Sequence, residues 1–249
     1  EVKEVKLEGE EMSVITQKGE YRARVVVGAD GVHSLVRKAR GFPKGPTLTL
    51  CLLIEEPADI KNDPALLFKM FLLDYSCMEQ GIYGLYYEIP CLINGVPHVQ
   101  RGITDHNPDL STGKLKEVFQ KELAKRGVDI NKHQLKAFPE RKIDPEGEFA
   151  KPHCLLVGES AGIDPLHGEG ISEAMEYAIL ASEAIVEAFA NKDFSFSKYK
   201  EAVINSRMGQ EKLRNLQYAK GLYGPGYVDT MPKMLAALKK TDTLEKLKI

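Results

Sequence analysis

The chain has 249 residues, 43% of them hydrophobic and 28% charged, a composition that is ordinary for a folded protein of one or two domains. Its 34 basic and 36 acidic residues give a net charge of −2 with no basic stripe, which argues against a nucleic-acid partner. No apolar run approaches the roughly 18 residues of a membrane-spanning helix. The four cysteines form no C-x-x-C pair, which predicts buried, reduced thiols rather than disulfides, metal ligands or an iron–sulfur cluster: Cys51, Cys77, Cys91 and Cys154.

The first 27 residues predict a β-meander that leads into a buried strand. Val2, Val5 and Leu7 indicate one strand, and residues 12–16 alternate as a second. Residues 25–27 are three consecutive valines, a pattern typical of a strand covered on both faces. A short helix is expected over residues 34–40, and the segment 41–46, rich in glycine and proline, marks a first domain boundary.

Residues 47–105 contain short strand-like segments with no helix between them, which predicts a mostly antiparallel sheet. Asn94 and Gly95 are a strong signal for a two-residue hairpin turn. Ser111 and Thr112 are expected to begin a helix of about 14 residues that ends at Gly127. Its core-facing side is predicted to consist of Leu115, Val118, Phe119, Glu122 and Leu123.

The most informative segment is LLVGESAGIDPLHGEGISEAM, residues 155–175. A short apolar strand ends at Gly158, a glycine-rich loop follows, and a helix is expected to begin at Ile171. Such a loop suits an anionic ligand because glycines admit close approach and a helix N-terminus carries roughly half a positive charge. Residues 24–37, RVVVGADGVHSLVR, repeat this order with Asp30 in the turn. If both strands belong to one layer, Asp30 and the 158–170 loop meet at one crevice.

The last 80 residues predict helices. The helix over residues 171–189 has an apolar stripe that is expected to face the core: Ile171, Met175, Ile179, Ile185 or Val186, and Phe189. One further helix is expected over residues 197–220. An amphipathic segment follows, in which Met231, Met234, Leu235 and Leu238 share a face, and both helix packing and contact with a membrane surface remain open for it.

The two glycine motifs carry a family resemblance. GADGVHSLVR resembles the second FAD/NAD(P)H motif of flavin-dependent hydroxylases and related reductases, and the later motif with its ending GEGI..AM is most similar to the geranylgeranyl reductase family. The resemblance implies an α/β (α+β overall) fold. Residues 1–45 and 149–190 would belong to an FAD-binding Rossmann-like domain, residues 46–148 to an inserted, mostly antiparallel substrate domain, and residues 191–249 to a helical C-terminal region.

Flavoproteins of this kind begin with a G-x-G-x-x-G unit that binds the cofactor pyrophosphate, and no such motif occurs in these 249 residues. We therefore expect the chain to be the C-terminal portion of a longer flavoprotein, or a half that associates with a separate chain. Without that unit it should bind FAD weakly.

The resemblance implies that the two motifs hold FAD, and the site residues carried over are Asp30, Gly31, Arg37, Gly158, Glu159, Ser160, Gly162, Pro165, Gly168, Gly170 and Ile171. Glu159 stands where the family usually has Asp, and Ser160 where it usually has Ala. A local turn contact is the alternative for Asp30, and an exposed position or a pairing with Asp30 for Arg37. Substrate contacts are expected from Tyr83, Tyr87 and His167, with core packing or local hydrogen bonds as the alternative. No catalytic residue and no metal site is assigned.

The implied activity is hydride transfer from reduced flavin to a double bond of a prenyl or other lipid-like substrate, with NAD(P)H as a candidate electron donor. The chain would be cytoplasmic or peripheral to a membrane. The absence of tryptophan departs from the family's substrate domain and puts a prenyl substrate in doubt. Two alternatives stay open: an aromatic monooxygenase that uses NAD(P)H and oxygen, and a fragment without catalytic activity.

Overall fold

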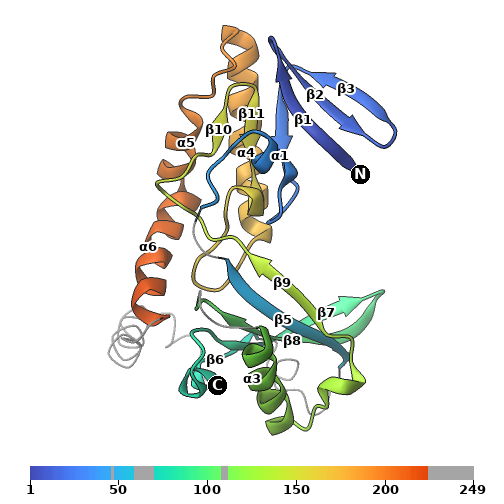
Figure 1. Ribbon diagram of the computed structural model, residues 1–249. Helices are drawn as coiled ribbons and strands as arrows, with labels where there is room; N and C mark the ends of the chain where they lie inside the picture. The colour runs from blue at the N-terminus through green and yellow to red at the C-terminus, as the bar shows by residue number, and fades with distance from the viewer. Residues whose placement is uncertain (46–47, 59–69, 108–111, 224–249) are drawn as a thin grey trace. The chain divides into compact units, whose positions relative to one another are not determined.

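The computed structural model describes residues 1–45, 48–58, 70–107 and 112–223 (Figure 1). The chain divides into two compact units. Unit 1 consists of Glu1–Thr47 and Glu140–Ala219, and unit 2 of Leu48–Pro139 and Lys220–Ile249. The α/β architecture with antiparallel sheets and C-terminal helices is confirmed. No helix within the described ranges is long and apolar enough to cross a membrane.

Unit 1 begins with the predicted meander and contains a second small sheet. Strands β1 (Val2–Glu8), β2 (Glu11–Thr16) and β3 (Gly19–Ala23) pair in that order and run antiparallel. The second sheet has the order β10 (Ala150–Lys151), β11 (Cys154–Leu156) and β4 (Val26–Gly28). β11 runs parallel to β4, with Leu156 opposite Gly28. The two glycine motifs therefore leave the sheet at the same edge.

Strand β4 is less covered than its valines predict. Val25 and Val26 are half-buried, and Val27 is exposed. Within the described residues β4 is the outer strand of its sheet, so one of its backbone edges has no strand beside it. The prediction of a strand covered on both faces is therefore wrong for these residues.

Four helices complete unit 1: α1 (Leu35–Ala39), α4 (Ile171–Asn191), α5 (Tyr199–Asn205) and α6 (Arg207–Leu222). The single helix expected over residues 197–220 is two helices, because Ser206 is extended and its hydroxyl accepts a hydrogen bond from Gly209 N at 3.0 Å. The segment 231–238 lies outside the described residues.

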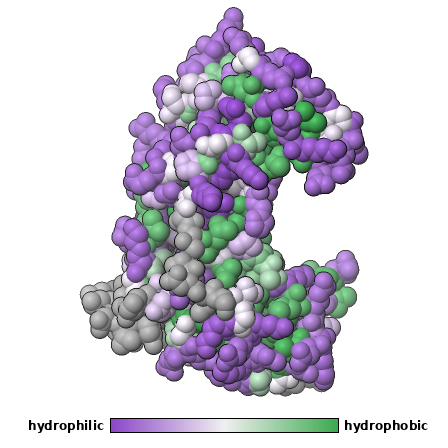
Figure 2. All heavy atoms as spheres, in the orientation of Figure 1, coloured by the Kyte–Doolittle hydropathy of each residue, from purple (hydrophilic) through white to green (hydrophobic). Residues whose placement is uncertain are grey.

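The predicted core stripe of α4 is wrong at five positions, whose side chains are exposed: Ile171, Met175, Ile179, Val186 and Phe189. Ile185, the alternative to Val186, is partly buried and packs against the core of unit 1. The face that packs into unit 1 carries Glu173, Tyr177, Ala181 and Ala188, whose small or hydrogen-bonded side chains permit close approach. Apolar side chains at the surface appear green among the polar ones in Figure 2.

Unit 2 is built on a five-stranded sheet in the order β6 (Leu72–Asp74), β7 (Tyr86–Ile93), β8 (Val96–Asp105), β5 (Thr49–Pro57) and β9 (Lys136–Glu140). The predicted hairpin is confirmed: Asn94 and Gly95 join β7 to β8 with φ of 52° and 79°. Helix α3 (Thr112–Lys125) buries all five residues of its predicted face. Gly127 follows it at φ 75°, in the left-handed conformation that ends helices.

None of the four cysteines forms a disulfide bond. Cys51, Cys77 and Cys154 are buried as predicted, whereas Cys91 on β7 is only partly buried. Burial raises the pKa of the Cys154 thiol to about 11, so this group is protonated at neutral pH.

Candidate functional site

The ends of β4 and β11 bring the two glycine motifs together, as the sequence predicts. Val157 N donates a hydrogen bond to Gly28 O at 3.0 Å, and the Ser160 hydroxyl donates to the same oxygen. Both turns therefore leave neighbouring parallel strands in one direction. This edge of an open α/β sheet is where such folds place their ligands.

Asp30 caps helix α1. Its Oδ2 accepts hydrogen bonds from Leu35 N at 2.7 Å and Val36 N at 3.1 Å, and Ser34 Oγ accepts one from Arg37 N at 2.9 Å. The local turn role considered for Asp30 is thus present, while its contact with a cofactor stays a prediction. Gly31 beside it has φ 75° and open space where a Cβ would stand, which leaves room for a ligand.

Arg37 is buried, not exposed as its helical position suggested, and only 5% of its surface is accessible. Its Nε and Nη2 donate to Pro43 O at 3.1 and 2.6 Å, and its Nη1 donates to Ser160 O at 3.1 Å. The guanidinium ties α1 to the loop after β11 and does not pair with Asp30. Burial lowers the pKa of Arg37, and the nearby charge of Arg141 adds to this effect.

Arg141 is a member of the site that no sequence motif indicated. Its Nη1 donates to Lys44 O at 2.5 Å and its Nη2 to Val32 O at 2.9 Å. Its Nε is buried and has no hydrogen-bond partner among the residues that the structure describes. A guanidinium N–H in this condition is a donor available to an anionic or carbonyl group.

Glu159 and Ser160 follow β11, and their side chains differ in burial. The Ser160 side chain is fully buried, and its hydroxyl lies 2.8 Å from Val157 O in addition to Gly28 O, so it holds the turn together. Glu159 is half-buried. Burial raises the pKa of its carboxyl, against the opposing effect of Arg141 and of the Arg141 and Val32 backbone N–H groups.

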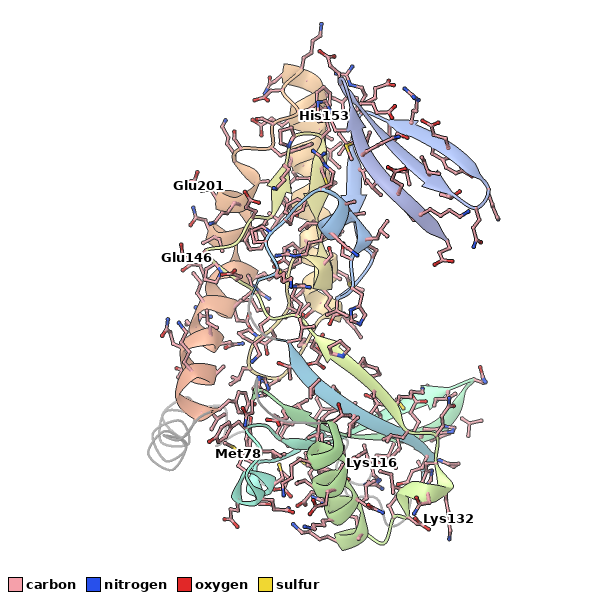
Figure 3. The ribbon with its side chains drawn as sticks, in the orientation of Figure 1. Met78, Lys116, Lys132, Glu146, His153 and Glu201 are labelled. Carbon is pink, nitrogen blue, oxygen red and sulfur yellow. The ribbon has the colours of Figure 1, made fainter. Side chains whose placement is uncertain are left out.

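The raised pKa of Glu159 predicts a pH-dependent cost to stability. A carboxyl whose pKa is higher in the folded state than in the unfolded state holds its proton more tightly when the protein is folded. The free energy of unfolding therefore falls as the pH rises from the unfolded-state pKa of this group to its folded-state pKa. Glu159→Gln is therefore expected to be more stable than wild type at pH 7 and equal to it at pH 3.5. Urea unfolding at both pH values checks this, with exposed Glu146 (labelled in Figure 3) replaced by Gln as a control. Equal stability at pH 7 would contradict the assignment.

The loop over residues 161–170 is closed by buried contacts. Gly162 has φ 124°, and Ile163 N donates to Arg141 O at 2.9 Å. Asp164 is buried, and its carboxylate accepts from His167 N and from Asn215 Nδ2, both at 2.7 Å. Gly162 and Pro165 are buried within this turn, whereas Gly168 and Gly170 are half-buried. The last two are the better placed for a ligand.

The N-terminus of α4 already binds a carboxylate. Oε1 of Glu169 accepts hydrogen bonds from Ile171 N at 3.0 Å and Ser172 N at 3.3 Å. Sequence reasoning missed Glu169, although an acid just before a helix start is a recognisable capping signal. The contact shows that this helix end accepts an anionic group, as its position after the glycine loop suggests.

The three predicted substrate residues lie in different units. His167, in unit 1, has its Nδ1 3.8 Å from Asp164 Oδ2, and burial lowers its pKa although the Asp164 charge opposes the shift. Tyr83 and Tyr87, in unit 2, are half-buried, and the Tyr87 hydroxyl lies 3.6 Å from Cys51 Sγ. Tyr86 between them is core, with its hydroxyl on Glu88. The substrate roles stay predictions.

No group of three or more His, Cys, Asp and Glu side chains in the described ranges is arranged to hold a metal ion. The polar groups around the glycine loop are backbone N–H groups, carboxylates and guanidinium groups.

No family model matches the chain, but comparisons with curated proteins and with solved structures find similar proteins. The chain is 31% identical over 190 residues to conditioned medium factor receptor 1 of Dictyostelium discoideum, a match that covers 74% of this chain and 36% of the receptor. It is 30% identical over 200 residues to digeranylgeranylglycerophospholipid reductase of Methanosarcina acetivorans, covering 73% of this chain and 44% of the reductase. The chain thus spans less than half the length of these curated relatives.

Solved structures share the fold. A geranylgeranyl bacteriochlorophyll reductase-like protein from Thermoplasma acidophilum matches with a TM-score of 0.69 and 19% identity, over 92% of this chain and 59% of that chain. The halogenase PltM, solved with phloroglucinol and FAD, matches with a TM-score of 0.61 and 16% identity, over 90% and 48%. The sequence match to the reductase and the shared fold support membership of the geranylgeranyl reductase family of FAD-dependent oxidoreductases.

Proposed function

We propose that the chain forms the flavin-facing portion of an FAD-dependent oxidoreductase that reduces double bonds of a prenyl or other lipid-like substrate. One observation carries the proposal. Parallel strands β4 and β11 bring two glycine motifs to the N-terminus of α4, where backbone N–H groups already bind a carboxylate. This arrangement suits the polar edge of a flavin, which becomes negative on reduction.

The residues present fit the flavin end of FAD. Asp30 and Gly31 would lie along one side, and Glu159, Gly168, Gly170 and Ile171 along the other. The unpaired Nε of Arg141 supplies a further donor. Bound FAD would supply the hydride chemistry, which no side chain of this site provides. The pyrophosphate half of the cofactor has no matching G-x-G-x-x-G loop in this sequence.

The chain's own groups would orient the flavin and stabilise its charge. The N–H groups of Ile171 and Ser172 would donate to the flavin only after the Glu169 carboxylate moves aside, because it occupies both of them. Arg37 and Ser160 act indirectly, because their hydrogen bonds fix the position of α1 against the loop after β11. Asp30 keeps the α1 turn in place in the same way.

The choice of a prenyl or lipid-like substrate rests on the match to digeranylgeranylglycerophospholipid reductase, a relative whose name gives a lipid substrate. Tyr83 and Tyr87 of the unit 2 sheet are the proposed substrate contacts, with His167 as a further candidate. NAD(P)H is the proposed electron donor. A cytoplasmic location at a membrane surface would agree with a lipid substrate.

Two other functions have observations in their favour. An aromatic monooxygenase is favoured by the fold of the aromatic hydroxylase CabE, which matches with a TM-score of 0.55 and 21% identity over 98% of this chain and 50% of that chain. A binding protein without catalysis is favoured by the relative named as a receptor. The absence of tryptophan also weighs against the prenyl substrate.

We expect the flavin-loaded protein, reduced with dithionite without oxygen, to saturate a prenyl double bond. Mass spectrometry of digeranylgeranyl glycerophospholipid would show a gain of two hydrogen atoms for each bond reduced. Substrate-stimulated NADPH oxidation with oxygen uptake and a hydroxylated aromatic product would establish the monooxygenase instead. Flavin binding with neither reaction would leave the non-catalytic function.

A further inference from the structure

Helix α6 makes two polar contacts within unit 1, one to the glycine loop and one to the first turn of α4. Asn215 Nδ2 donates to Asp164 Oδ1 at 2.7 Å, and the Lys212 ammonium forms an ion pair with Glu173 in the first turn of α4. Asp164, Glu173 and Lys212 are each 4% exposed or less. These contacts join α6 to Asp164 in the glycine loop and to Glu173 in the first turn of α4. The two residues lie at the ends of the segment whose N–H groups bind the Glu169 carboxylate.

The ion pair is more than a surface contact, because both charges are removed from water. A buried charge that loses its partner must be hydrated again, and for Glu173 this means opening the first turn of α4. A cavity of about 330 Å³ lies beside this turn, lined by Asp164, His167, Glu169, Ser172, Glu173 and Lys212 among others. The loop and the first turn therefore have room to move when α6 no longer holds them.

Asp164 links Asn215 of α6 to the loop backbone. Its second oxygen accepts from His167 N, and its own N–H donates to Glu169 O at 3.1 Å, which places Glu169 at the helix end. Without Asn215, one oxygen of a buried carboxylate loses its described partner, and the turn that presents Gly168 and Gly170 loses its anchor.

We propose that Lys212 and Asn215 are positioning residues, which hold the 164–170 loop and the first turn of α4 in the arrangement that receives the flavin. This inference rests on the proposed flavin site, but the placement of the backbone can be measured without flavin. Neither residue belongs to the two motifs that carry the family resemblance.

The test is amide hydrogen exchange of the full chain for residues 164–172, in Lys212→Met, Glu173→Gln, the double variant and Asn215→Ala. We expect exchange at least tenfold faster in each single variant. The double variant Lys212→Met with Glu173→Gln should exchange within about threefold of the faster single variant, because both changes break the same contact. Arg207→Met is the matched control: it removes a positive charge from the same helix, but this side chain is 88% exposed and 4.0 Å from Glu176. This control should leave the amide exchange of residues 164–172 unchanged.

Recovery of wild-type exchange in the double variant would show that the ion pair is not needed to hold the loop, and additive effects of the two changes would show that the two residues act independently; either result would overturn the proposal. Unchanged exchange in the single variants would overturn it as well. FAD affinity, measured by flavin fluorescence on the same proteins, should fall at least tenfold in the single variants and little further in the double. If wild type binds no FAD while exchange shows the expected pattern, the flavin function fails and the positioning of the loop stands. Equal FAD affinity in all variants would overturn the positioning role alone.

Discussion

Replacing Gly162 by alanine is expected to lower the free energy of unfolding by about 3–5 kcal/mol. Gly162 has φ 124°, a conformation that residues with a Cβ rarely adopt, and a Cβ there would stand 2.6 Å from Ile143 Cα. That neighbour is backbone held by the hydrogen bond of Ile143 N to Ile163 O at 3.0 Å, so it cannot move aside cheaply. Urea unfolding of wild type and variant gives the difference.

Gly9→Ala is the control for Gly162→Ala. Gly9 also has a positive φ, 64°, but nothing lies within 4 Å of a Cβ at that position. It should cost about 1 kcal/mol, the conformational penalty alone. Equal losses in the two variants would show that the close approach of the Gly162 loop to residues 142–143 does not matter.

Arg37→Met is expected to cost about 2–3 kcal/mol of stability. The methionine keeps most of the apolar stem, but Pro43 O and Ser160 O lose their charged donors. Arg37→Lys should recover little of this, because one ammonium group cannot reproduce the planar fork that reaches both carbonyls. Chemical unfolding checks the size of the effect.

Lys38→Met is the neighbouring control for Arg37, since Lys38 is exposed on the same helix and should change the free energy of unfolding by less than about 0.5 kcal/mol. If Arg37→Met is as stable as wild type, the guanidinium does not fasten α1 to the loop after β11. The loop would then depend on Ser160 alone.

Local signals in the sequence were sufficient for much of the fold. The hairpin at Asn94 and Gly95 follows from the φ values that only such residues adopt readily, and the buried face of α3 follows from its helical spacing. The meeting of the two glycine motifs follows from the rule that parallel strands end at one edge.

The sequence could not predict which face of α4 is buried. Its large apolar residues form one stripe, and Tyr177, Ala181 and Ala188 lie on another. Hydrophobicity alone favours the first, whereas packing in unit 1 uses the second. Amphipathic spacing shows that a helix has an apolar side, but it does not show which neighbouring element covers that side. The same limit applies to Val27, whose exposure depends on what lies beside β4.

Long-range polar contacts were also beyond the sequence. The sequence alone predicts an exposed helix residue at Arg37, because the carbonyls of Pro43 and Ser160 that bind it are brought close only by the fold. Arg141 lies in a segment without a motif, and the pairing of Lys212 with Glu173 joins two helices far apart in the chain. Such contacts depend on the tertiary fold, because no local spacing rule relates the partners.

The most direct test of the proposed flavin site is the hydrogen-exchange footprint of FAD on the full chain. Binding should be weak, since the contacts of a G-x-G-x-x-G loop, each worth roughly 1.5–3 kcal/mol, are missing, so FAD is added at about 1 mM. We expect slower exchange in residues 29–36 and 158–172 together, the same protection with FMN, and none with ADP. Equal exchange with and without FAD in both segments, or protection confined to other parts of the chain, would contradict the assignment of this sheet edge as a flavin site.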